Sequence, residues 1–171
     1  VNIGIFFGLQ GRVITTSSAC TSGSQAVGYS CEAIRYGQAD VMIAGGAEEL
    51  CPTMAIVFDT LFATSCRNDA PHTAPKPYDR DRDGLVIGEG GAALILEERE
   101  HALARGATIY AEIVGFGTNM DGSHVTDPKS ETMGEALNLA LGDAGLPSQA
   151  IGFVSGHGTA TLQGDTAETI A

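Results

Sequence analysis

The hydrophobic positions of the first fifty residues switch between helix-like and strand-like spacing. Apolar residues recur at intervals of four and three at Val27, Cys31 and Ile34. This spacing predicts one face of a helix, which Gly37 ends. The apolar run 41–44 is closed by two glycines and is typical of a strand covered on both faces. We also expect short strands near the N-terminus and over 13–15.

The middle of the chain combines a long polar loop with apolar runs separated by glycine. The pattern predicts a helix over 54–63, an ordered loop over 66–83 and a short charged helix over 97–105. A loop of that length usually serves a site. The runs 85–87 and 92–96 predict a pair of strands.

A second alternation of strand and helix begins after Gly106. Strand-like spacing starts at Ile109, and a further strand is expected over 151–155. Between them a helix is predicted from the apolar positions Met133, Leu137, Leu141 and Ala144. Thr132 and Glu135 stand at capping-box spacing for this helix, and Gly145 ends it.

These elements predict an α/β fold with a mainly parallel or mixed sheet, because strands and helices alternate along the chain. We expect two units, residues 1–105 and residues 106–171. The chain begins with Val, and a helix is only starting over 165–171. We therefore expect that the sequence is an excerpt of a longer chain.

Composition narrows the function classes. Glycine accounts for 23 of 171 residues and aromatic residues for only 6%, so close backbone packing is expected. The net charge of -12 disfavours nucleic-acid binding, and no apolar run approaches the roughly 20 residues of a membrane span. The four cysteines lack the spacing of a zinc site or a disulfide framework, which indicates thiols in a reducing cytoplasm.

Cys20 is the first candidate for chemistry. It lies among small polar residues between a predicted strand and a predicted helix. A sharp turn there would place the sulfur at the helix N-terminus, where partial positive charge favours the nucleophilic thiolate. The alternative is a small buried hydrophobic residue.

His157 is the second candidate. It follows a predicted strand between two glycines, so its ring can point into a crevice and donate a hydrogen bond or carry a proton. A structural histidine is the alternative. A Cys and a His from two strand ends are a known arrangement for acyl transfer.

The acidic run 79–84 imitates the first half of a calcium loop. The imitation fails because Gly90 stands where the bidentate Glu belongs and two arginines interrupt the carboxylates. We predict instead an Asp/Arg network that fixes the long loop. The glycines at 88–91 lack the spacing of a phosphate loop.

Four motifs in register resemble the β-ketoacyl-acyl-carrier-protein synthases, the condensing enzymes of fatty-acid and polyketide assembly. The motifs are Ser18-Ala19-Cys20-Thr21-Ser22-Gly23, Ala44-Gly45-Gly46-Ala47-Glu48, Arg82-Asp83-Gly84 running into Gly88-Glu89-Gly90, and His157-Gly158-Thr159-Ala160-Thr161. The resemblance covers essentially all 171 residues. It implies a thiolase-like fold, with residues 1–105 ending the N-terminal half and 106–171 starting the C-terminal half.

The resemblance also implies roles for individual residues. Cys20 would accept an acyl chain as a thioester, and His157 would polarise the thioester carbonyl of malonyl-carrier protein during decarboxylation. Thr159 and Thr161 would hydrogen-bond the pantetheine arm, and Phe58 would touch the acyl chain. No metal or bound cofactor is implied, because phosphopantetheine arrives on the acyl-carrier protein, and a homodimer is the usual assembly.

Two departures from the family pattern affect this interpretation. The usual His-Gly-Thr-Ser-Thr-Pro reads here as His157-Gly158-Thr159-Ala160-Thr161-Leu162. A second catalytic His, a Lys and a Gly-Phe-Gly-Gly loop would lie beyond Ala171, so we expect that the excerpt alone does not condense.

Two other functions stay open. One is a non-catalytic chain-length partner subunit of a condensing heterodimer, against which Cys20 argues. The other is a different Cys-His acyltransferase or hydrolase, which would need a group that orients His157. For docking an acidic carrier protein, the candidates are the basic residues of the long loop, Arg67, Lys76, Arg80 and Arg82.

Overall fold

The computed structural model describes residues 1–171 as two compact units. The first unit comprises residues 1–47 and 91–110, and the second comprises residues 48–90 and 111–171. Each unit therefore combines two separate stretches of chain. The expected division of the chain at 105/106 stays a prediction.

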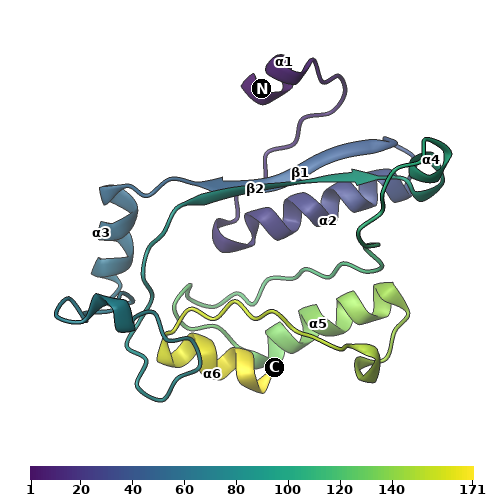
Figure 1. Ribbon diagram of the computed structural model, residues 1–171. Helices are drawn as coiled ribbons and strands as arrows, with labels where there is room; N and C mark the ends of the chain where they lie inside the picture. Colours follow the sequence, from purple (N-terminus) through teal and green to yellow (C-terminus); the bar gives the residue numbers. More distant parts are fainter. The chain divides into compact units, whose positions relative to one another are not determined.

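The first unit is built on a pair of strands. β1 (Val41–Glu48) pairs with β2 (Gly90–Glu97), and the two strands run in opposite directions (Figure 1). The helix α2 (Ser22–Arg35) runs along this pair, and α4 (Arg99–Ala104) follows β2. The helix predicted after Cys20 and the strand predicted from Val41 are thus confirmed.

Glycine and alanine let the helix and the strands of this unit approach closely. A Cβ added to Gly46 in β1 would lie 3.5 Å from the Cα of Gly23 in α2. A Cβ added to Gly45 would overlap the carbonyl oxygen of Ala92 in β2. The buried hydrophobic residues of the unit are likewise small, namely Ala33, Ala44 and Ala102. Backbone proximity therefore replaces large side chains in this core.

The second unit combines long loops with three α-helices. Its helices are α3 (Pro52–Thr60), α5 (Ser130–Ala144) and α6 (Leu162–Ile170), with short 3₁₀ turns η2 (Pro71–Thr73) and η3 (Ser148–Ala150). α5 contacts α6. The long loop predicted over 66–83 is confirmed, with η2 inside it.

Segment 115–117 packs directly against α5. At its two glycines, the space between the segment and the helix is too small for a side chain. A Cβ on Gly117 would overlap the carbonyl oxygen of Ala136, and one on Gly115 would overlap that of Ala140. Between them, the backbone N–H of Phe116 donates to Asp143 at 2.9 Å. The two glycines thus allow the chain to run directly along the helix.

Besides the strand expected at the N-terminus, four predicted strands do not form. Residues 13–15, 109–116 and 151–155 lie in no strand, and 85–87 contributes only an isolated bridge between Leu85 and Thr64. A strand requires a hydrogen-bonded neighbour, which local spacing cannot supply. The partner of β2 is accordingly β1 and not the nearby run 85–87.

The helix ends follow the predictions in part. α5 ends at Gly145, whose φ of 64° is left-handed as predicted. It begins at Ser130, however, so the predicted capping box is wrong, and the Thr132 hydroxyl donates to the carbonyl of Lys129. The chain also opens with the helix α1 (Asn2–Phe7) where a strand was expected.

No helix combines the length and apolar character needed to cross a membrane. All four cysteines are free thiols. Several large apolar side chains remain exposed, among them Phe6, Phe62 and Phe153.

A carboxylate at the end of β2 holds the helix that follows. The Glu97 side chain, 8% exposed, accepts hydrogen bonds from the Arg105 guanidinium at 2.5 and 2.7 Å and contacts the His101 ring at 2.6 Å. The hydrogen bonds from Arg105 and then His101 lower the pKa of Glu97 to about 2. The folded state therefore favours the ionised carboxylate.

We predict that Glu97→Gln lowers the melting temperature near neutral pH and that the difference shrinks in acid. The ordinary pKa of Glu97 is 4.5 and the folded value is about 2, so its stabilisation is present above pH 4.5 and is lost as the pH falls toward 2. Thermal unfolding between pH 7 and pH 2.5 measures this. Glu100→Gln, at an exposed pair with Arg99, is the matched control and should change little at any pH. Equal shifts for both variants would contradict the prediction.

We also predict that Gly117→Ala destabilises the protein by about 1–3 kcal/mol, because the new Cβ overlaps α5. The control is Gly142→Ala in α5, where the added Cβ meets nothing within 4 Å. That change should stabilise by about 0.5–1 kcal/mol through helix propensity. Chemical denaturation compares the two. A Gly117→Ala protein as stable as the unsubstituted one would show that segment 115–117 does not need the glycine.

Candidate functional site

Cys20 lies in the turn that enters α2. The turn is the 3₁₀ segment η1 (Ala19–Thr21), and α2 follows it directly at Ser22. The first N–H groups of a helix lack partners within the helix and carry partial positive charge. The Cys20 side chain is exposed, so the alternative of a buried hydrophobic cysteine is wrong.

His157 belongs to a turn that two carboxylates of α6 hold by its backbone. Glu168 accepts the backbone N–H groups of His157 and Gly158, the latter at 2.9 Å, and the Tyr78 hydroxyl at 2.5 Å. The bond to Glu168 raises the pKa of Tyr78 to about 12. Burial works to raise the pKa of Glu168, but the hydrogen bonds from Gly158, Tyr78 and His157 outweigh it and lower that pKa. Glu168 is therefore an ionised acceptor of three donors.

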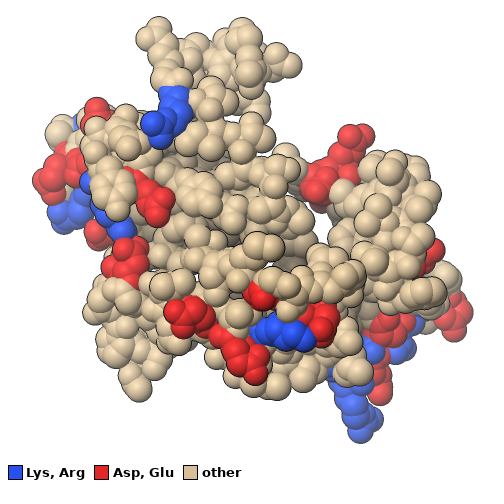
Figure 2. All heavy atoms as spheres, turned by 180° about the vertical axis from the view of Figure 1, so that it is seen from behind, with Lys and Arg blue, Asp and Glu red and all other residues tan.

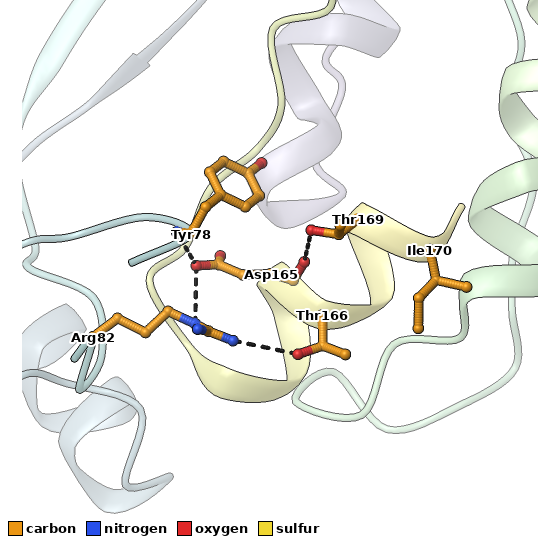
Figure 3. A pocket seen from close by; sticks show the side chains of 6 residues that line it. All are labelled: Tyr78, Arg82, Asp165, Thr166, Thr169 and Ile170. Atoms are coloured by element: carbon orange, nitrogen blue, oxygen red, sulfur yellow. Dashed lines mark hydrogen bonds and ion pairs between the residues drawn. The ribbon is translucent and has the colours of Figure 1, made fainter. Parts of the chain in front are cut away.

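Asp165 joins the same turn to the long loop. Its carboxylate is 1% exposed and accepts the backbone N–H of Tyr78 at 2.7 Å and that of Ala160 at 3.0 Å. The Arg82 guanidinium lies 3.2 Å away as its ion-pair partner. Figure 3 shows Tyr78 and Arg82 converging on Asp165 of α6.

The guanidinium of Arg82 donates further hydrogen bonds around Asp165. It donates to the carbonyl oxygens of Thr161, Leu162 and Asp79 and to the Thr166 hydroxyl. The surrounding pocket has a volume of only about 180 Å³. It is smaller than ordinary ligand pockets of 300–1,000 Å³, and apart from Ile170 its lining residues are already paired with one another (Figure 3). Its role is therefore structural.

The other two residues of the Arg82-Asp83-Gly84 motif, Asp83 and Gly84, stabilise the long loop in different ways. Asp83 accepts hydrogen bonds from the hydroxyl of Ser65, the backbone of Cys66 and the Arg67 guanidinium at 2.9 to 3.1 Å. Gly84 has a φ of 136°, and a Cβ there would lie 2.6 Å from the carbonyl oxygen of Ala63. The predicted Asp/Arg network of the long loop is thus confirmed.

No group of three or more His, Cys, Asp or Glu side chains is arranged to hold a metal ion.

Thr159 and Thr161 lie together in the turn after His157. Their hydroxyl oxygens are 2.8 Å apart, and the Thr161 hydroxyl also caps α6 by accepting the N–H of Gly164 at 3.1 Å. Two hydroxyls carry two protons, and their mutual hydrogen bond uses one. The other proton remains to donate to an acceptor outside the pair.

The remaining candidates are distributed over the second unit. Phe58 is half-buried in α3. Of the four basic residues of the long loop, Arg67 and Arg82 are paired with Asp83 and Asp165, whereas the Arg80 side chain is 93% exposed beside Asp81. On the face shown in Figure 2, most basic side chains likewise lie beside acidic ones.

Cys20 belongs to the first unit and His157 to the second. Their proximity therefore stays a prediction from the sequence. The sequence reasoning did not single out Tyr78, Asp165 or Glu168. The available signal was the spacing of three residues between Asp165 and Glu168, which places both carboxylates on one side of a helix that follows the His157 turn.

We predict that Asp165→Asn lowers the free energy of unfolding by about 3 kcal/mol, because it leaves the nearly buried Arg82 without its counter-charge. The matched control is Asp127→Asn, at an exposed pair with Lys129, which should cost less than about 1 kcal/mol. Chemical denaturation of both variants measures the difference. Equal losses would show that the Asp165 pair does not fix the turn.

Comparison with known proteins assigns the chain to a family. The model of "Beta-ketoacyl synthase, N-terminal domain" matches residues 2–102, and that of "Beta-ketoacyl synthase, C-terminal domain" matches residues 110–171. The chain is 47% identical over 170 residues to 3-oxoacyl-(acyl-carrier-protein) synthase 2 of Vibrio cholerae, which covers 98% of this chain and 41% of that protein.

Solved structures agree with this result. The crystal structure of a β-ketoacyl synthase from Burkholderia phymatum is 58% identical with a TM-score of 0.97, covering 99% of this chain and 41% of that one. A type II polyketide ketosynthase bound to a hexaketide, in complex with its acyl-carrier protein, is 38% identical with a TM-score of 0.94, covering 99% and 42%. The present chain thus spans about two fifths of the length of these relatives. Both family models and the shared fold place the chain in the β-ketoacyl synthase family, with its thiolase-like α/β architecture.

Proposed function

We propose that the whole protein catalyses decarboxylative Claisen condensation of an acyl thioester with malonyl-acyl-carrier protein, in fatty-acid or polyketide synthesis. The observation that carries the proposal is the place of Cys20, an exposed thiol in the turn that enters α2. The family supports the reaction class, since similar proteins are named 3-oxoacyl-acyl-carrier-protein synthase and polyketide ketoacyl synthase. We further propose a cytoplasmic homodimer as the working form.

The first half-reaction transfers the acyl group to Cys20. The thiolate attacks the carbonyl carbon of the acyl-pantetheine thioester, the carbon–sulfur bond to pantetheine breaks, and the carrier leaves as a thiolate that takes a proton from water. The backbone N–H of Cys20 stabilises the oxyanion that forms. One such donor is worth about 3 kcal/mol of the barrier.

The second half-reaction forms the carbon–carbon bond. His157 donates a hydrogen bond to the malonyl thioester carbonyl, so that the electron pair left by departing carbon dioxide is stabilised as an enolate. The enolate carbon attacks the acyl group on Cys20, and the thiolate leaves to complete the cycle. The hold of Glu168 on the backbone of His157 supports this role, because a fixed donor needs no reorganisation when charge develops.

Binding of the partner uses the neighbouring residues. Phosphopantetheine comes with the acyl-carrier protein, and the free proton of the Thr159–Thr161 pair is available to a carbonyl of its arm. Phe58 contacts the acyl chain. For docking the acidic carrier, Lys76 and Arg80 are better candidates than Arg67 and Arg82, because the Arg80 side chain is 93% exposed even beside Asp81, whereas those of Arg67 and Arg82 are only 33% and 11% exposed in their ion pairs.

The alternative hydrolase would need a carboxylate or amide that orients the His157 imidazole. Glu168 is a carboxylate of the right kind, but it binds the backbone N–H of His157. The arrangement therefore favours a hydrogen-bond donor at His157 over a base of a catalytic triad.

The test is intact mass spectrometry of the full-length protein with an acyl-carrier thioester donor. We predict a gain of one acyl group, lost in Cys20→Ala and kept in Cys66→Ala, which removes another exposed thiol. His157→Ala should still be acylated but should form ketoacyl product at least about a hundredfold more slowly, whereas His124→Ala should not.

Two other outcomes would reject the proposal. If the unsubstituted protein takes up no acyl group, the chain-length partner becomes the better assignment. If water removes the acyl group faster than malonyl-carrier protein does, the protein is a hydrolase.

A further inference from the structure

The residue before Cys20 has a backbone conformation that must be held in place. Ala19 has a φ of 54°, in the left-handed region that residues with a Cβ rarely adopt. Because Ala19 links Ser18 to Cys20, its two torsion angles set the direction in which the Cys20 side chain leaves the turn. A change at Ala19 would therefore redirect the thiol.

Two hydroxyl groups fix the peptide groups on both sides of Ala19. The Ser22 hydroxyl accepts the backbone N–H of Ser18 at 2.8 Å and donates to the carbonyl of Ala19 at 2.7 Å. The Thr21 hydroxyl donates to the carbonyl of Ser18 at 2.9 Å. Both carbonyl groups that flank Ala19 are thus hydrogen-bonded within the turn.

A third hydroxyl group, that of Ser18, connects the Thr21 hydroxyl to Gln25. The Ser18 hydroxyl donates to the side-chain oxygen of Gln25 at 2.5 Å and lies 3.0 Å from the Thr21 hydroxyl. Because the one proton of the Ser18 hydroxyl goes to Gln25, its oxygen faces Thr21 as an acceptor, and the single Thr21 proton is shared between this oxygen and the carbonyl of Ser18. Gln25 stands on α2 itself and is half-buried. It therefore connects the turn to the rigid body of the helix.

We propose that Gln25, acting through the hydroxyl of Ser18, is a positioning residue for the Cys20 thiol. Its amide oxygen fixes the Ser18 hydroxyl, which restrains the turn around Ala19 and keeps the thiol at the N-terminus of α2. The expected effect of Gln25 on acyl transfer rests on the proposed function. Its expected effect on the reactivity of the Cys20 thiol does not.

The direct test is the rate at which iodoacetamide alkylates Cys20 in the full-length protein, followed by peptide mass spectrometry. The exposed Cys66 of the same molecule is the internal reference. Gln25→Leu removes the acceptor, and we expect roughly a three- to tenfold slower reaction at Cys20 with no change at Cys66. The matched control is Gln38→Leu, whose amide oxygen accepts from Arg12, and it should leave both rates unchanged.

Coupling to Ser18 distinguishes positioning from a general loss of structure. Ser18→Ala should slow alkylation as much as Gln25→Leu does, and the double variant should be no slower than either, because both changes break one connection. Ser18→Thr keeps the hydroxyl and should restore the rate to within about twofold. The proposal would be overturned if the double variant slowed alkylation by the product of the two single effects. Equal alkylation rates for Gln25→Leu and Gln38→Leu would also overturn it.

A second measurement covers folding and catalysis. If Gln25→Leu does not fold, Thr21→Val removes the neighbouring hydroxyl at almost constant volume and should give the same loss at Cys20. In acyl transfer from the carrier, Gln25→Leu should lower the rate constant without changing KM for the carrier, and a change in KM alone would count against positioning. If the unsubstituted protein is not acylated at all, the proposed function fails, and the alkylation rates still decide this inference.

Discussion

The buried Asp165 carboxylate is the constraint on which the second unit depends. It has a counter-ion in Arg82 and two backbone donors, from Tyr78 and Ala160, so its charge is compensated although it is 1% exposed. A buried carboxylate without such partners would cost several kcal/mol. The pair therefore requires the long loop and the His157 turn to keep one relative arrangement.

Glu168 extends this arrangement one turn along α6. It binds the backbone of His157 and Gly158 while Asp165 binds that of Ala160, so three N–H groups of one turn meet two carboxylates of one helix. The turn contains two residues with positive φ, Gly158 and Ala160, and at Ala160 this conformation needs the support of such contacts. Tyr78 contributes to both carboxylates, through its backbone to Asp165 and through its hydroxyl to Glu168.

In the first unit, neutral groups hold the turn that contains a left-handed residue. There a left-handed residue, Ala19, is held by serine and threonine hydroxyls and not by carboxylates. Acidic side chains would disfavour a thiolate at Cys20, whereas hydroxyls hold the backbone without adding charge. At His157 the carboxylates bind backbone N–H groups, and the proposed role there is that of a hydrogen-bond donor. The electrostatic character of each turn thus suits the chemistry that we propose for it.

The sequence by itself determined the local features of this protein. The spacing of apolar residues located α2 and α5, the glycine at 145 marked a helix end, and the small residues around Cys20 indicated a turn before a helix. The motifs also indicated the family. All of these depend on residues close together in the chain, for which periodicity and turn chemistry are sufficient guides.

Only the tertiary structure decided the partners. β2 pairs with β1 and not with the run at 85–87, and Asp165 binds the backbone of Tyr78, 87 residues earlier. Arg82, a docking candidate by sequence, is instead the counter-ion of Asp165. Strand pairing and ion pairing are contacts between distant residues, and many alternative partners of equal chemistry exist along the chain. Their selection depends on which backbones approach closely enough, as the glycines at 45, 46 and 117 allow, and this is a property of the folded chain.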